Sequence, residues 1–84
     1  MKRMIEEIAQ AIGRERAEVV IQDGEHMDVY ITMHTQKAVA KLIGKCGSTA
    51  KLIRDIVSRA YHADEMVHAP KRINITIRNG GEKE

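Results

Sequence analysis

Two glycines flank two other residues in the segment Gly44-Lys45-Cys46-Gly47, and this spacing could serve phosphate chemistry. Gly44 can reverse the chain without a Cβ penalty, and Gly47 leaves its main chain open to close approach. Lys45 adds a mobile cation. If a helix begins just after Gly47, its free N–H groups and partial positive charge point at the loop. The segment therefore favours binding of a phosphate group, although such a spacing taken alone is more often an ordinary turn between helices.

Basic side chains gather around this loop. Residues 35–60 hold six basic residues and one acid, Asp55, a balance of +5, whereas residues 1–34 have a balance of −3 and residues 61–84 a balance of zero. A local basic field suits a polyanion such as nucleic acid, although solvated helix faces also carry many lysines. The six cations are Lys37, Lys41, Lys45, Lys51, Arg54 and Arg59.

The first part of the chain predicts a helix followed by a hairpin. Apolar residues at helical spacing favour a helix over 1–12, with Gly13 as its C-terminal cap. Alternating apolar residues within 17–33 predict two antiparallel strands with one buried face. Asp23-Gly24 lies between them, and we expect a tight turn there because both positions of that turn favour positive φ.

The second part predicts two helices on either side of the loop. Thr35 can cap a helix that stops at Gly44, and Ser48 or Thr49 can cap the next one. Alternation over 73–78 then predicts a last strand. The apolar stripes of the two helices are Val39, Leu42 and Ile43, and Leu52, Ile53, Ile56, Val57 and Ala60; we assign Leu42, Leu52 and Ile56 to the core alone.

The order is therefore helix, strand, strand, helix, helix, strand (α-β-β-α-α-β). We expect one α+β domain over residues 1–78, with residues 62–70 as a polar connection and residues 79–84 as a flexible C-terminal tail. The helix pair is long enough for a crossover, so the last two strands can be parallel. This predicts a three-stranded mixed sheet with three helices on one face.

The run Leu42-Ile43-Gly44-Lys45-Cys46-Gly47, with Ala50, Ile53 and Val57 behind it, resembles the signature of KH domains. In that signature an aliphatic-Ile-Gly-x-x-Gly run is followed by apolar positions three residues apart. The element order resembles the type II KH arrangement. The resemblance covers residues 1–78 and is strongest to the small, single-domain bacterial KH proteins, which bind RNA.

The resemblance implies a narrow groove that grips about four single-stranded nucleotides, with the loop clamping the sugar-phosphate backbone. Cys46 departs from the usual polar or basic loop residue, and Ala50 is smaller than the usual aliphatic, which makes the groove floor shallower. Carried over, the RNA-binding residues are the clamp Gly44, Lys45, Cys46 and Gly47, the apolar floor Val39, Ile43 and Ile53 with Ile31 as a further candidate, and the peripheral cations Lys37, Lys41, Lys51 and Arg54.

We therefore expect a non-enzymatic module that binds single-stranded RNA, or single-stranded DNA, as an RNA chaperone or post-transcriptional regulator. The alternative is a KH-shaped protein-interaction module that acts as a homodimer or beside a second KH protein. No catalytic grouping, cofactor motif or small-molecule site is evident. The histidines are scattered and the single Cys46 has no matched base, so we expect no metal site. One cysteine and the lack of a long apolar run favour the cytoplasm.

Overall fold

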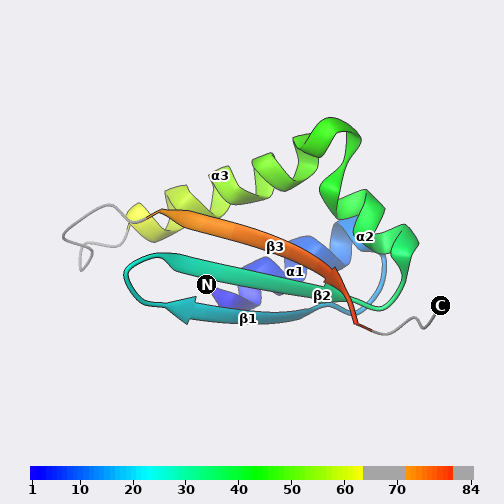
Figure 1. Ribbon diagram of the computed structural model, residues 1–84, viewed down its shortest axis with the longest axis horizontal. Helices are drawn as coiled ribbons and strands as arrows, with labels where there is room; N and C mark the ends of the chain where they lie inside the picture. Colours follow the sequence, from blue (N-terminus) through cyan, green and yellow to red (C-terminus); the bar gives the residue numbers. More distant parts are fainter. Residues whose placement is uncertain (64–71, 81–84) are drawn as a thin grey trace.

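The computed structural model describes residues 1–63 and 72–80 (Figure 1). It is an α+β arrangement of three helices and three strands in the predicted order, with a short 3₁₀ turn at the loop. The prediction of a connection over 62–70 falls mostly outside the described residues. The elements are α1 (Lys2–Gly13), β1 (Glu18–Asp23), β2 (Met27–Met33), α2 (Gln36–Ile43), η1 (Lys45–Gly47), α3 (Ser48–His62) and β3 (Ile73–Asn79).

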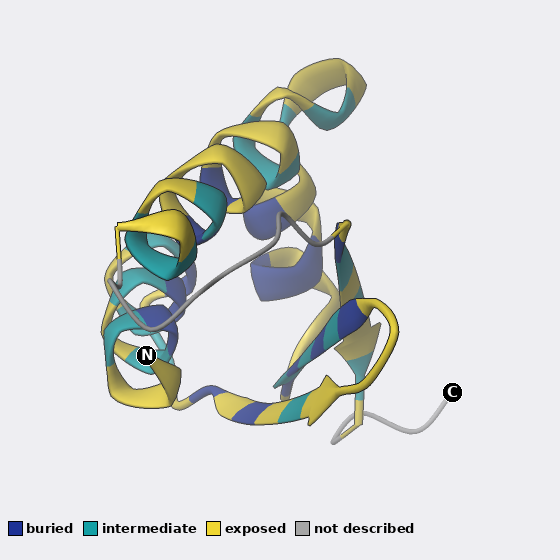
Figure 2. Ribbon diagram, turned by 90° about the vertical axis from the view of Figure 1, so that its left-hand side faces the viewer, coloured by how far each residue is buried: buried dark blue, intermediate teal, exposed yellow. Residues whose placement is uncertain are grey.

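The three strands form one mixed sheet in the order β1-β2-β3. β1 is antiparallel to β2, and β3 is parallel to β2, as the crossover through α2 and α3 predicts. The helices lie on one side of the sheet (Figures 1 and 2). Asn79 belongs to β3 and the Gly80 N–H donates to the Met33 carbonyl, so pairing with β2 extends beyond the predicted end of the domain at residue 78.

The core lies between the sheet and the helices and is aliphatic. It includes Leu42, as predicted, but Leu52 and Ile56 are 59% and 38% exposed. Their assignment to the core is wrong because α1, α2 and β3 cover only one side of α3: Ile53 and Val57 face inward, and the outer side of the helix is uncovered (Figure 2). The largest fully buried side chains are Ile5, Val29, Ile31, Met33, Leu42, Ile53 and Val57.

The predicted hairpin is present, but its turn is different. Asp23 pairs with Met27, and residues 24–26 form the connection. Neither Asp23 nor Gly24 has positive φ. A two-residue turn at these positions would pair odd-numbered with even-numbered residues and place apolar side chains opposite polar ones. The longer loop pairs Val19 with Ile31 and keeps both on the buried face.

The end of α1 also differs from the prediction. Gly13 is the last residue of the helix and is buried, and the left-handed cap is Arg14, whose N–H donates to the Gln10 carbonyl at 2.8 Å. A Cβ on Gly13 would lie 2.6 Å from Met33 Cε. The glycine therefore permits close packing of α1 on β2, and the chain reverses one residue later.

Glu15 ties the segment after α1 to the start of α2. Its carboxylate accepts the Thr35 hydroxyl at 2.7 Å, the Thr35 N–H at 3.0 Å and the N–H of His34. The Thr35 hydroxyl in turn accepts the Ala38 N–H at 3.2 Å, which confirms Thr35 as the cap of α2. The Thr35 hydroxyl first, and then the two N–H groups, hold the pKa of Glu15 below its ordinary value despite the opposing effect of partial desolvation.

We expect Glu15→Gln to lower the stability of the domain at neutral pH, because a neutral amide accepts these three donors less well than a carboxylate. The pKa of Glu15 is lower in the folded than in the unfolded state, so its contribution is full above the ordinary carboxyl pKa of about 4.3 and is lost as pH falls through the folded pKa. Urea unfolding at stepped pH should show a gap between the variant and the parent that closes in acid. Glu18→Gln, on the exposed side of β1, is the control; a constant gap would contradict the role of the carboxylate.

Candidate nucleic-acid interface

The loop between α2 and α3 has three of its four residues at positive φ. Gly44 lies at φ 75°, ψ 176°, Cys46 at φ 56°, ψ 29°, and Gly47 at φ 75°, ψ 12°. The Gly44 conformation is essentially restricted to glycine. These angles turn the chain sharply enough for α3 to start within four residues of the end of α2, and they leave Lys45 and Cys46 exposed at the tip.

The two glycines have different surroundings. A Cβ on Gly44 would lie 2.2 Å from Thr49 Oγ1 and 2.8 Å from the Thr49 main-chain nitrogen, so the folded loop has no room for a side chain there. A Cβ on Gly47 would meet nothing within 4 Å. Gly44 is therefore required by packing inside the protein, and the space in front of Gly47 is open to a ligand.

The amino end of α3 has no side-chain cap. The predicted caps Ser48 and Thr49 are wrong: Gly47 is the N-cap, and the helix begins at Ser48 without a side-chain hydrogen bond. The tight loop leaves no residue in the extended conformation that a capping hydroxyl needs. The N–H groups of Lys45 and Cys46 also have no backbone acceptor among the described residues. The N–H groups of Gly47 and Ser48 donate to the Gly44 and Lys45 carbonyls, so the N–H groups of Lys45 and Cys46 are the loop donors that the described residues leave free beside the positive end of the α3 dipole.

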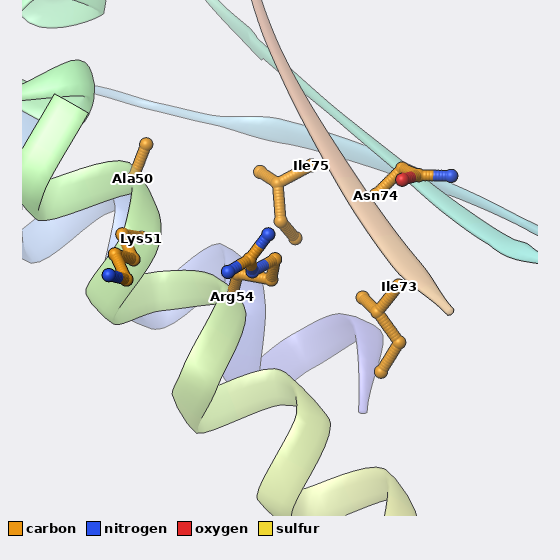
Figure 3. A pocket seen from close by; sticks show the side chains of 6 residues that line it. All are labelled: Ala50, Lys51, Arg54, Ile73, Asn74 and Ile75. Atoms are coloured by element: carbon orange, nitrogen blue, oxygen red, sulfur yellow. The ribbon is translucent and has the colours of Figure 1, made fainter. Parts of the chain in front are cut away.

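A cleft of about 350 Å³ lies between the first half of α3 and β3 (Figure 3). From α3 it is lined by Ala50, Lys51 and Arg54, so it begins within three residues of the loop. Lys51 and Arg54 are predicted site residues. The other four lining residues are not: Ala50 on α3, and Ile73, Asn74 and Ile75 on β3.

β3 borders the cleft with the free edge of the sheet. The Arg72 carbonyl accepts the Met27 N–H, and the Gly80 N–H donates to the Met33 carbonyl, both at 2.9 Å. Main-chain groups of successive strand residues point to opposite sides, so the even-numbered residues of β3 bond to β2. Ile73 and Ile75 therefore direct their N–H and C=O groups away from β2, towards the cleft. The edge offers donors and acceptors that the sheet does not use.

The structure does not bring every predicted site residue to this cleft. Val39 and Ile53 are 5% and 1% exposed and Ile31 is fully buried, so these three belong to the core rather than to a groove floor. Val39 and Ile53 lie on the inner sides of α2 and α3, and Ile31 lies on the face of β2 that the helices cover. Ile43 is 40% exposed at the end of α2, next to the loop, and does not line the cleft.

The predicted cations are all exposed. Lys37 and Lys41 lie one turn apart on α2, outside the cleft, and Lys45 is at the loop tip. Among residues 1–63 and 72–80 the ion pair present is Arg3–Glu7 on α1, so the cations of α2, the loop and α3 have no acidic partner there. Their charge is available to a partner outside this part of the chain.

No group of three or more His, Cys, Asp or Glu side chains in the described part of the chain could hold a metal ion. None of the described helices is long and apolar enough to cross a membrane. Comparison with known protein families, curated proteins and solved structures finds no match to this chain.

Proposed function

We propose that this protein is a KH-type, non-enzymatic module that binds single-stranded RNA, with the loop Gly44–Gly47 gripping the sugar-phosphate backbone. The proposal includes the type II KH arrangement expected from the sequence and action in the cytoplasm as an RNA chaperone or post-transcriptional regulator. The observation that carries it is the left-handed loop, which presents uncapped main-chain donors and Lys45 at one end of a cation-lined cleft.

The loop suits a phosphate for three physical reasons. Its N–H groups and the α3 dipole favour an anion, as at other helix amino ends. Gly47 lets a bulky sugar-phosphate approach the main chain, because no side chain occupies the space in front of it. Lys45 contributes a full charge at the tip, and Lys51 and Arg54 continue the positive charge along α3.

The cleft suits unpaired bases. Its walls combine the apolar Ala50, Ile73 and Ile75 with the free main-chain groups of β3, so a flat base can pack on one set and hydrogen-bond to the other. A duplex hides its base edges and is too wide for a cleft of about 350 Å³. We therefore expect single strands to bind and duplexes of the same sequence to bind much more weakly.

The test is a fluorescence-anisotropy titration of a labelled eight-nucleotide RNA at several salt concentrations. Affinity near the micromolar range is expected for one small cleft, about −8 kcal/mol. The log–log salt slope should be about −2 to −3, which corresponds to three or four phosphate contacts at about −0.7 each. Matched DNA and duplex RNA give the comparison. Equal binding of the duplex, or no binding of the single strand at low salt, would contradict the proposal.

A protein-interaction module is the second candidate, and the outer side of α3 favours it. Leu52 and Ile56 lie one helical turn apart and are both substantially exposed, where polar residues are usual. Sedimentation with and without RNA separates the two functions. A stable dimer that ignores RNA, and that Leu52→Ser with Ile56→Ser dissociates without unfolding, would favour this candidate over RNA binding.

A further inference from the structure

Arg54 lines the cleft at a distance from the loop that we propose to bind the phosphate. It lies nearly two turns into α3, away from the loop, and its guanidinium extends from the helix towards β3 (Figure 3). The ammonium group of Lys51, by contrast, is directed away from β3 in the same view. Of the two cations that line the cleft, Arg54 is therefore the one directed towards β3 and the side chain of Ile75.

The ligand group beside Arg54 should be a base rather than a phosphate. The cleft here is lined by apolar side chains from both walls, Ala50 on α3 and Ile73 and Ile75 on β3, and such a surface suits a flat aromatic ring. Phosphates are better served at the loop, where main-chain donors and the helix dipole gather. A strand held at the loop by its backbone would turn its bases towards β3.

We propose that Arg54 is a specificity-determining residue that favours bases with two adjacent hydrogen-bond acceptors on one edge. This inference rests on the RNA-binding function proposed above. A guanidinium carries parallel N–H donors in a fixed fork and cannot accept a hydrogen bond. It matches guanine, through O6 and N7, or cytosine, through O2 and N3. Adenine and uracil alternate donors with acceptors along their edges and satisfy only one arm of the fork.

Nothing in the described structure competes with this role. Arg54 is exposed, and it has no ion pair or hydrogen bond to residues 1–63 or 72–80. The neighbouring acid Asp55 lies on the exposed side of α3 and does not line the cleft. The Arg54 guanidinium is thus free to bind a base. The main-chain N–H and C=O groups of Ile75 that β2 does not use can hydrogen-bond to another edge of the same base.

The test uses four labelled RNA octamers, all uridine except for the two central positions, which are UU, AA, CC or GG. Because a bidentate contact discriminates between bases, we expect the parent to bind CC or GG about tenfold more tightly than UU and AA. Comparing the affinities for the CC and GG octamers shows which of these two bases is preferred. Arg54→Lys keeps the charge but removes the fork, and should retain the salt slope while its preference falls to about twofold or less.

Arg59→Lys makes the same change on α3 outside the cleft and should leave the preference intact. Equal binding of all four RNAs by the parent, or a preference that survives in Arg54→Lys, would overturn the inference and leave the RNA-binding function standing. If none of the four RNAs binds, the proposed function fails and this inference fails with it.

Discussion

The variant carrying Lys45→Asp and Cys46→Asp should bind single-stranded RNA about 100-fold more weakly than the parent while keeping its fold. Two carboxylates at the loop tip would face the phosphates that we propose to bind there, and like charges brought together cost several kcal/mol. The fold should tolerate both changes. Cys46 lies in the left-handed region, which aspartate accepts more readily than most residues, and acids are favourable near the amino end of α3.

A control with the same change in net charge separates a local effect from a general one. Lys2→Asp with Gly24→Asp also lowers the net charge by three, but at residues towards the hairpin end of the molecule (Figure 1). Lys2 is exposed, and a Cβ on Gly24 meets nothing within 4 Å. This control should lose only a few-fold in affinity, through the long-range field. Equal losses of RNA affinity in both variants would mean that the loop makes no specific contact with the RNA. Circular dichroism shows whether each variant keeps its fold.

Gly44→Ala should destabilise the domain by about 3 kcal/mol. Alanine is strained at φ 75°, ψ 176°, which costs roughly 1–3 kcal/mol. Its Cβ would also overlap the Thr49 side chain and the Thr49 main-chain nitrogen, and the latter cannot move without shifting the start of α3. Urea unfolding followed by circular dichroism measures the loss. A loss below about 1 kcal/mol would show that the loop can adopt another conformation.

Gly47→Ala is the matched comparison. Its φ of 75° makes alanine unfavourable by about 1 kcal/mol, but no atom lies near the added Cβ. We therefore expect a small loss of stability and a larger loss of RNA affinity, since the methyl group would occupy the space proposed for the sugar-phosphate backbone. Gly44→Ala and Gly47→Ala thus separate the glycine that the fold requires from the glycine that the ligand requires.

Periodicity was sufficient to predict the elements and the sheet directions. Alternation in the strands and the i, i+4 stripes of the helices depend on local sequence, and the length of the helix pair indicated a parallel last strand. The boundaries and caps of the helices were harder to predict, because they depend on packing between segments that are distant in the sequence. Gly13 lies inside α1 rather than at its cap because it must pack closely against Met33, which is twenty residues away.

The candidate site shows the same division. The loop was predicted from the local spacing of its glycines. Lys51 and Arg54 were predicted as site residues because basic residues are dense in this part of the chain. The resemblance implied a groove, but the residues that line the cleft were not predicted, because apolar stripes do not say which side of a helix remains uncovered: Leu52 was assigned to the core and is exposed. The alternation at Ile73 and Ile75 predicts a strand, but nothing in the sequence marks these residues as part of a binding site. Their place follows only from the sheet order, which makes β3 an edge strand beside α3.

The proposal that the loop and the cleft form one RNA-binding site is tested most directly by a ¹⁵N–¹H correlation spectrum recorded during titration with a single-stranded RNA octamer. We predict progressive shifts of the main-chain amides in two segments, 44–50 around the loop and 73–75 along the free edge of β3, with the hairpin residues 22–28 unchanged. Shifts confined to the outer side of α3 at Leu52 and Ile56, or an unchanged spectrum at saturating RNA, would contradict it.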